Sequence, residues 1–470
     1  MAVASLMVLS ACAARNKVEG ADAEESQQVA QPAPASDSAP AGETFGDLES
    51  PCGEGDYTVE PDEAKGSSDT LRIGVANDRT SQIRPGLNKE LWDTSVAFAA
   101  WCNAQGGIGG LEIELVDLPG DLLAVESAMT AACADTFMLV GGGFVQDNLE
   151  FSGKPNSDFH ECGLADIPGF TASPEKGDSN GQVQPIPHPS VKAPGLWFRD
   201  FRELHPEEAE KVAVVWGNLP ALAAIRNQAE AVIEAEGSEV VATPDYLPTG
   251  ETDWTPLAQE LIGSGAESFH WVGEPNMAGA FVKTLREQGW EGYPVLETNV
   301  YDQIYVDTAG VDAAQGTILR TAFHMFEEAD QWPAVQQYLD ILNDNVEDPK
   351  VAFLGMQSFS AWLLFATAAN DCAAGNDDTL TRACILEAAA AIDGWTAGGL
   401  HSATDPGPEG GEPPQCSMLL QVNADGEFER LYPEVDGDGD AGDGFACADD
   451  ATVDVPANEG LGKIGGDQPL

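Results

Sequence analysis

The sequence predicts an α/β protein built as two lobes, each with its own doubly wound parallel sheet. Short apolar runs alternate with amphipathic helical stretches in residues 71–140, and the same rhythm restarts over 211–296. Alternation of this kind requires parallel strands joined by right-handed crossover helices. A loop-rich stretch, 174–196, separates the two runs. Two lobes are therefore favoured over one continuous sheet.

The individual elements follow from apolar periodicity and from glycine stops. Strands are expected over 71–76, 111–116, 137–140, 212–216, 239–242, 268–272 and 293–296. Helices are expected over 88–105, 124–134, 220–236, 254–262, 276–288, 331–345, 356–371 and 380–391. Beyond Gly394 the chain becomes rich in Gly, Pro and Asp.

The N-terminus carries the pattern of an export signal. The apolar stretch 1–9 leads into Leu9-Ser10-Ala11-Cys12, which resembles the lipobox of bacterial lipoproteins, in which the cysteine is lipidated. Residues 1–12 are therefore expected to be a signal peptide ending at Cys12, with a start codon further upstream because no Lys or Arg precedes them. Residues 13–69 have few large apolar side chains and are expected to form a disordered tether. The alternative is an accidental cysteine in a disordered leader.

The net charge and the cysteine content narrow the range of possible functions. The 470 residues include 79 acidic and 21 basic ones, a net charge of -58, which excludes nucleic-acid binding. The nine cysteines become eight without Cys12, and an even number favours disulfides in an oxidising compartment. The six histidines are scattered and CxxC is absent, so neither a metal nor a cofactor is expected.

An ordered set of motifs then resembles one family. It comprises Asn103-Ala104-Gln105-Gly106-Gly107-Ile108-Gly109-Gly110, Val140-Gly141-Gly142-Gly143, Ile167-Pro168-Gly169-Phe170-Thr171-Ala172-Ser173, Trp197-Phe198-Arg199 and the helix over 281–289. Across 70–430 the chain resembles the type I periplasmic binding proteins, in particular the branched-chain amino acid binding proteins of ABC importers. The resemblance implies two lobes joined by three crossover strands, with a solute bound between them.

On this basis we expect lobe one over 70–195 plus 298–395 and lobe two over 196–297 plus 396–435. Residues 436–470 are expected to be an acidic flexible segment. Within it, the run Asp436 to Asp443 resembles the start of a calcium loop. It lacks the turn glycine and the bidentate glutamate, so a flexible acidic loop is favoured over a metal site.

Ligand contacts are expected directly after the strands, because ligands of open α/β sheets bind beyond the carboxyl ends of the strands. The candidates are Thr80, Ser81, Gly143, Phe144, Thr171, Ala172, Ser173, Trp216, Asn218, Glu274, Asn276, Tyr301 and Asp302. By resemblance, the stretch around Thr171 would hold a ligand carboxylate, although Phe144 stands near a usual serine. Glu274 would hold an ammonium. Turn capping, helix-dipole pairing and core packing are the competing roles for these residues.

Four disulfides are expected from the same map. Cys102 and Cys133 sit on the first two helices, which we expect to flank one sheet. Cys372 with Cys384 closes a short loop, Cys416 with Cys447 ties down the C-terminal segment, and Cys52 with Cys162 remains by elimination.

The function favoured is a monomeric, lipid-anchored binding protein that captures a small polar solute, an amino acid or an amide-like compound, and delivers it to ABC permease subunits. A ligand sensor of the same fold, coupled to a signalling partner, is the alternative. An enzyme is not expected, because no nucleophile elbow, HExxH or GxGxxG after a strand is present.

Overall fold

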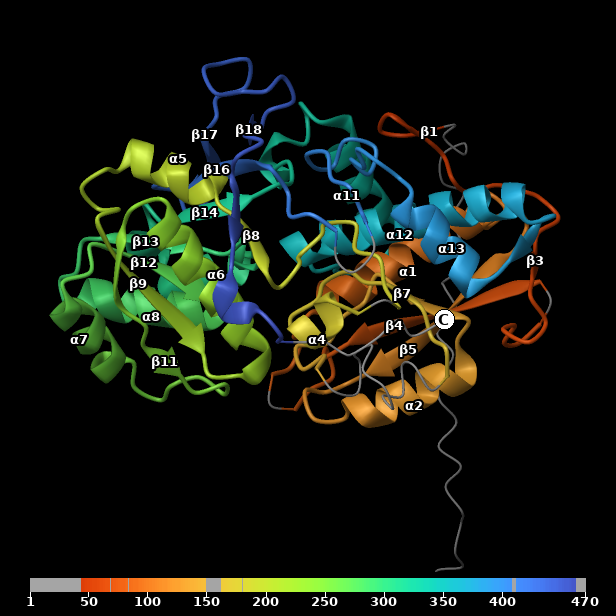
Figure 1. Ribbon diagram of the computed structural model, residues 1–470, viewed down its shortest axis with the longest axis horizontal. Helices are drawn as coiled ribbons and strands as arrows, with labels where there is room; N and C mark the ends of the chain where they lie inside the picture. Colours follow the sequence, from red (N-terminus) through yellow and green to blue (C-terminus); the bar gives the residue numbers. More distant parts are fainter. Residues whose placement is uncertain are drawn as a thin grey trace, which may run out of the picture.

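Each of the two predicted lobes has its own sheet (Figure 1). The computed structural model describes residues 44–67, 69–82, 84–148, 162–179, 181–407 and 411–461. The expected signal peptide, the lipidation site Cys12 and residues 13–43 of the expected tether lie outside this range. Among the described residues, no helix combines the length and apolar character needed to cross a membrane.

The sheet of lobe one has four parallel strands in the order β5-β4-β6-β7. These strands are β4 (Thr70–Asn77), β5 (Glu112–Pro119), β6 (Met138–Val140) and β7 (Asp166–Ile167). Their side chains are largely buried on both faces, as expected for a parallel sheet covered by helices.

The helices of lobe one cover both faces of this sheet. They are α1 (Lys89–Ala104), α2 (Val125–Asp135), α4 (Pro174–Gly177), α11 (Pro333–Asn345), α12 (Phe353–Gly375) and α13 (Arg382–Ala390). Helix α12 is apolar on nearly all sides because it lies between α1, α13 and the sheet. Helices α1 and α2 belong to separate core clusters, one around Ile73 and one around Leu118.

Lobe two is built on a larger, mixed sheet whose main path is β10-β9-β12-β13-β14-β16-β17. Its strands are β9 (Lys211–Gly217), β10 (Glu239–Ala242), β11 (Asp245–Tyr246), β12 (Ser268–Val272), β13 (Tyr293–Leu296), β14 (Ile318–Thr321), β16 (Cys416–Val422), β17 (Phe428–Tyr432) and β18 (Ala446–Cys447). Strands β9 to β14 run parallel, whereas β16 and β17 are antiparallel.

The helices of lobe two are α5 (Leu196–Leu204), α6 (Pro220–Ala235), α7 (Thr255–Ser264), α8 (Pro275–Glu287), α9 (Gln303–Ala309) and α10 (Val311–Ala314). Short pairs complete the structure. They are β1 (Thr44–Phe45) with β2 (Leu48–Glu49), β3 (Thr58–Val59) with β15 (Thr379–Leu380), and β8 (Lys192–Pro194) with β19 (Thr452–Asp454). Among the described residues, 3₁₀ turns cover Thr298–Val300, Phe326–Glu328 and Pro456–Asn458.

In the described part of the chain, three segments pass between the lobes, and they are hydrogen-bonded to one another. The amide of His324, on the second passage, donates to the carbonyl of Leu400, on the third, at 3.0 Å. The hydroxyl of Thr404 donates to the carbonyl of Pro185, on the first passage, at 2.7 Å. The fold class predicted from the sequence, two α/β lobes with crossover segments, is therefore confirmed.

The expected lobe boundary at residue 298 is wrong. Strand β14 continues the parallel sheet of lobe two, and α9 packs against α8. The chain enters lobe one again with α11, which packs on α1. The helices α9 and α10 and the strand β14 thus follow β13 before the second passage, which the prediction placed too early.

The expected tether is also too long, because residues 44–67 pack on lobe one. Phe45 is fully buried and its ring lies 5.0 Å from that of Phe359. The expectation of a flexible C-terminal segment is also wrong over 436–461. Phe445 is fully buried there, and β19 pairs with β8. A few large apolar residues in a polar stretch are enough to anchor each segment. Residues 462–470 lie outside the described range.

Two of the four expected disulfides are confirmed and two are wrong. Cys372–Cys384 and Cys416–Cys447 are present, but the remaining bonds are Cys52–Cys102 and Cys133–Cys162. Cys102 cannot reach Cys133 because α1 and α2 cover opposite faces of the sheet. The strand order explains this arrangement: the chain leaves β4 for β5 and then crosses back over β4 to β6. Right-handed crossovers in opposite directions put their helices on opposite faces.

Candidate functional site

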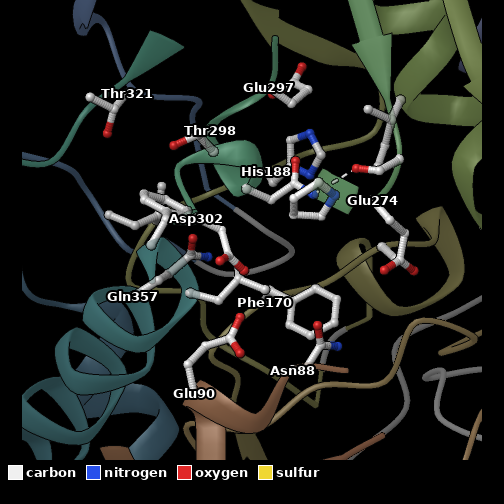
Figure 2. A pocket seen from close by; sticks show the side chains of 18 of the residues that line it. Asn88, Glu90, Phe170, His188, Glu274, Glu297, Thr298, Asp302, Thr321 and Gln357 are labelled. Carbon is white, nitrogen blue, oxygen red and sulfur yellow. Dashed lines mark hydrogen bonds between the residues drawn. The ribbon is translucent and has the colours of Figure 1, made fainter. Parts of the chain in front are cut away.

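A cleft of about 300 Å³ lies between the lobes and is lined by residues from both of them. It opens where parallel strands end. Phe170 lies beyond β7, Glu274 beyond β12, Thr298 beyond β13, and Thr321 ends β14. This is the edge at which open α/β sheets bind ligands. Figure 2 shows polar side chains from both lobes facing this space.

Five of the thirteen expected ligand-binding residues line the cleft. These are Thr171, Ala172, Glu274, Asn276 and Asp302. All of them follow a strand or a short turn after one, so the strand-exit rule placed them at the cleft, and their contact with a ligand stays a prediction.

In lobe one, five expected residues lie outside the cleft lining. They are Thr80, Ser81, Gly143, Phe144 and Ser173. Thr80 is exposed and donates to Asp121, whereas Ser81 accepts the amide of Arg84. Phe144 is buried in the core beneath α2.

Gly143 and Ser173 have structural roles as well. A side chain at Gly143 would collide with the ring of Phe170. The hydroxyl of Ser173 caps α4 by accepting from the amide of Lys176 at 3.2 Å. Turn and core roles therefore account for these positions.

In lobe two, Trp216, Asn218 and Tyr301 also lie outside the cleft lining. The ring of Trp216 packs under the guanidinium of Arg226, 4.9 Å away. The amide group of Asn218 donates to Asp245 at 2.6 Å, and Tyr301 is buried with its hydroxyl bonded to Glu327. These three side chains make their contacts elsewhere in the fold and not in the cleft.

A buried carboxylate occupies the backbone donors near Thr171. The two oxygens of Asp147 accept the amides of Ala172 and Ser173, each at 2.8 Å. Burial raises the pKa of Asp147 to about 6, although these hydrogen bonds oppose the shift. The N–H groups expected to hold a ligand carboxylate are thus already bound by the chain itself.

Asp78 has the same role at the end of β4. Its carboxylate accepts the amides of Leu122 and Val145 at 2.8 and 2.9 Å. Burial raises the pKa of Asp78, while the two amides lower it. Two strand exits of lobe one are therefore closed by internal carboxylates.

An ion pair spans the cleft between Arg84 of lobe one and Glu274 of lobe two. The same guanidinium donates to the side-chain oxygen of Asn276 at 3.0 Å. Both charged side chains are less than one-fifth exposed. Burial raises the pKa of Glu274, and Arg84 opposes this shift. The pair links the two lobes across the cleft.

A second cross-lobe contact is centred on Lys350. Its ammonium lies 2.9 Å from Glu90, on α1, and 2.8 Å from Asp302, at the start of α9. Burial raises the pKa of Glu90, the ammonium opposes that shift, and the nearby Asp302 adds to it. Burial would lower the pKa of Lys350, but the two carboxylates outweigh it and raise the pKa.

The third charged group lies against lobe two. Glu297 contacts Arg320 at 2.6 Å and the ring of His270 at 2.9 Å. Burial would raise the pKa of Glu297, but Arg320 and His270 lower it overall. Burial and the Arg320 charge lower the pKa of His188, which also lines the cleft, so its imidazole is neutral near pH 7.

Some polar groups in the cleft have no partner among the described residues. The side-chain nitrogen of Asn88 and the hydroxyl of Thr298 are buried and make no hydrogen bond there. Around them stand Phe170, Phe353, Leu354 and further apolar side chains. A few unfilled polar groups set in an apolar wall are typical of a binding site for a small organic molecule.

The charged lining escaped sequence reasoning for identifiable reasons. Glu297 directly follows β13, so the strand-exit rule applied strictly would have found it. Arg84 lies seven residues beyond β4. Glu90 lies in the first turn of α1 and Lys350 shortly before α12, and both reach the cleft only in the folded arrangement. Nothing in the local sequence marks these three.

In the described ranges, no three His, Cys, Asp or Glu side chains are grouped to hold a metal ion. In the acidic run near the C-terminus, the carboxylate of Asp440 instead accepts the amides of Asp436, Gly442 and Gly444, each at 2.8 Å. Its oxygens thus stabilise their own loop.

A two-lobed fold with a polar-edged cleft at the strand exits defines a solute-binding receptor. The sequence model of the family described as periplasmic binding protein matches residues 172–427, more than half of the chain. The chain belongs to this family. Its members bind solutes and are not enzymes, as the absence of catalytic motifs predicted. They work on the extracytoplasmic side of the membrane. No curated protein sequence matches the chain.

Solved structures share the fold at low identity. A leucine-binding protein, LivK, from Thermotoga maritima is 12% identical, with a TM-score of 0.60 over 77% of this chain and 98% of its own. A fatty acid ABC transporter substrate-binding protein from Thermomonospora curvata is 14% identical, with a TM-score of 0.64 over 80% and 94%. LivJ from Streptococcus pneumoniae, solved with isoleucine, is 16% identical, with a TM-score of 0.60 over 77% and 100%. These matches show that the chain has the type I periplasmic binding protein fold.

Proposed function

We propose that this chain is the solute-capturing subunit of an ABC importer, which binds a small organic molecule between its lobes and passes it to permease subunits. The observation that carries the proposal is the cleft of about 300 Å³ at the strand exits, lined from both lobes and bridged by Arg84–Glu274 and Lys350–Asp302. The two ion pairs can form only when the lobes are close together. A solute that binds between the lobes therefore shifts the equilibrium between open and closed arrangements.

Hinge closure is supported by the way the lobes are connected. The three passages lie side by side and are hydrogen-bonded between His324 and Leu400 and between Thr404 and Pro185. Each lobe has its own sheet, so a rotation at the passages leaves both sheets intact. Two of the similar structures support transport as the purpose, because they are transporter substrate-binding proteins.

The test combines binding with closure. A thermal-shift screen of small solutes should yield ligands that stabilise the protein, by about 2.7 kcal/mol at 100 times the dissociation constant. With such a ligand, small-angle scattering should show a smaller radius of gyration, and a permease reconstituted in vesicles should import the ligand only when the protein is added. Binding without a change in radius would contradict hinge closure, and binding without import would contradict the transport role.

The membrane attachment is a separate part of the proposal. The sequence ending at Cys12 supports cleavage before this cysteine and lipidation of it, and the protein would then act as an anchored monomer. Mass spectrometry of the protein from its native membrane should find a diacylglyceryl group on Cys12. A Cys12→Ser variant should be released from the membrane without losing solute binding. Retention of that variant on the membrane would contradict the anchor.

A further inference from the structure

The cleft lining has more negatively charged than positively charged side chains. The described lining contains three cationic side chains, Arg84, Arg320 and Lys350, and four carboxylates, Glu90, Glu274, Glu297 and Asp302. Arg84 is paired with Glu274, and Arg320 with Glu297. Lys350 is shared between Glu90 and Asp302. Every lining cation is therefore engaged, and one carboxylate is in excess beside Lys350.

The backbone groups that could hold an anion are largely engaged as well. Asp147 and Asp78 each accept two amides at the strand exits of lobe one. Three helices also begin at the cleft with a carboxylate of their own. Glu90 lies in the first turn of α1, Glu274 precedes α8 and Asp302 caps α9. A carboxylate at a helix N-terminus compensates the positive end of the dipole, which then attracts a ligand anion less.

We propose that the cleft takes a solute with a positively charged nitrogen at one end and an apolar body, and that Glu90 and Asp302 contact that nitrogen. This inference rests on the proposed function, since it names the chemical class that the same cleft would capture. Figure 2 shows Glu90 and Asp302 turned toward the same space as Gln357, beside the ring of Phe170. A charge-assisted hydrogen bond to a carboxylate and an aromatic face are both suited to an ammonium or amidinium group.

The apolar residues of the cleft wall indicate what the rest of the solute is like. Phe170, Phe353, Leu354, Leu87 and Ile186 line the cleft on the lobe-one side and along the passages. A dry cavity of about 150 Å³ holds a benzene molecule, and this cleft has about 300 Å³. An aromatic ring with a short chain therefore fits the space.

The test uses four probes that share a phenyl ring and a short chain but differ in charge. Phenethylamine is a cation, phenylalanine a zwitterion, hydrocinnamate an anion and hydrocinnamamide neutral. Isothermal titration of the full chain should give phenethylamine a dissociation constant at least about tenfold lower than the other three. A broader thermal-shift library, sorted by charge, should give hits concentrated among amines and amidines.

Two variants test the contact residues. Glu90→Gln and Asp302→Asn should each weaken phenethylamine binding by about 10- to 100-fold, because a hydrogen bond between charged partners is lost. Hydrocinnamamide binding should change little. Asn is as good a helix cap as Asp, so Asp302→Asn should keep α9 in place and remain folded. Asp245→Asn, an exposed lobe-two carboxylate that contacts Asn218, is the matched control and should not alter binding.

The outcomes separate this inference from the proposed function. Equal or tighter binding of phenylalanine, hydrocinnamate or hydrocinnamamide would overturn the cationic preference while supporting solute capture. The same holds if library hits are mostly acids or neutral compounds. If no compound of any charge class binds, solute capture itself is contradicted, and the charge preference with it. Unchanged phenethylamine affinity in both cleft variants would overturn the assigned contacts.

Discussion

Arg84 and Glu274 belong to different lobes and form an ion pair across the cleft, with Asn276 accepting a second hydrogen bond from the same guanidinium. Because both side chains are mostly shielded from water, the pair is stronger than an exposed one. The pair therefore stabilises the lobe separation seen here. Any solute that enters must either preserve this pair or replace it.

We expect Arg84→Gln and Glu274→Gln to shift the unliganded protein toward more open arrangements. A double-mutant cycle on the open–closed equilibrium should give a coupling energy of about 0.5–3 kcal/mol. Small-angle scattering or a fluorescence distance between labelled lobes measures the shift. Arg199→Gln removes ion pairs with Glu236 and Asp450, neither of which lines the cleft, so this control should leave the radius unchanged. An equal effect of the control would show that the cross-cleft pair does not hold the lobes.

The disulfide pattern gives a second prediction. Peptide mapping without reduction should recover Cys52 linked to Cys102 and Cys133 linked to Cys162. Replacing Cys52 and Cys102 together by Ser should cost about 2–5 kcal/mol, since the bond closes a long loop and ties the segment over 44–67 to α1. Urea denaturation measures this loss. A peptide joining Cys102 to Cys133 would instead contradict the placement of α1 and α2 on opposite faces of the sheet.

Much of the fold could be predicted because it depends on local patterns. Strands β10, β12 and β13 have the bounds that apolar runs and their stops predicted. The wrong predictions concern relations between distant segments. A bond between Cys102 and Cys133 requires α1 and α2 to lie on one face of their common sheet, and the strand order puts them on opposite faces. The strand order determines which face each helix covers, and local periodicity does not encode it.

The residues of the candidate site likewise fall into two groups, those that local patterns predict and those that depend on the folded arrangement. Glu274, Asn276 and Asp302 follow strands, and the general location of ligands in α/β sheets was enough to find them. Arg84 and Lys350 reach the cleft only because two lobes meet there. Asp147 illustrates a further limit. Its carboxylate accepts hydrogen bonds from the amides of Ala172 and Ser173. No sequence pattern indicates that these two donors are engaged within the protein.

The pH dependence of stability should depend on Asp200. Burial, reinforced by Glu203, raises the pKa of this carboxyl to about 7. In the unfolded chain it titrates near 4, so the folded protein binds more protons between about pH 4 and 7. The stabilising contribution is therefore fully present below about pH 4 and is lost as the pH rises through 7. Stability should fall over this range for this reason.

Asp200→Asn removes the group that titrates. Compared with the native chain, this variant should gain stability progressively from pH 4 to pH 8, on the order of a few kcal/mol at the upper end. Urea denaturation at a series of pH values measures the difference. Glu207→Gln, an exposed carboxylate on the same lobe, should show a flat difference. A flat difference for Asp200→Asn as well would mean that the carboxylate is solvated in the folded protein.

The last prediction concerns Lys176, on α4, and Asp166, on β7, whose charged groups lie 2.9 Å apart and are buried. Lys176→Met leaves the Asp166 charge buried without its partner, which should cost about 3–5 kcal/mol of folding free energy. The double variant Lys176→Met/Asp166→Leu should recover most of this loss, because both charges are then removed from the apolar interior. Lys192→Met breaks a more exposed pair with Glu412 and should cost about 0–1 kcal/mol. Chemical denaturation of the four proteins measures these values. Equal costs for the two single lysine variants would contradict the buried position of Lys176, because only a buried partner makes the loss of an ion pair so expensive.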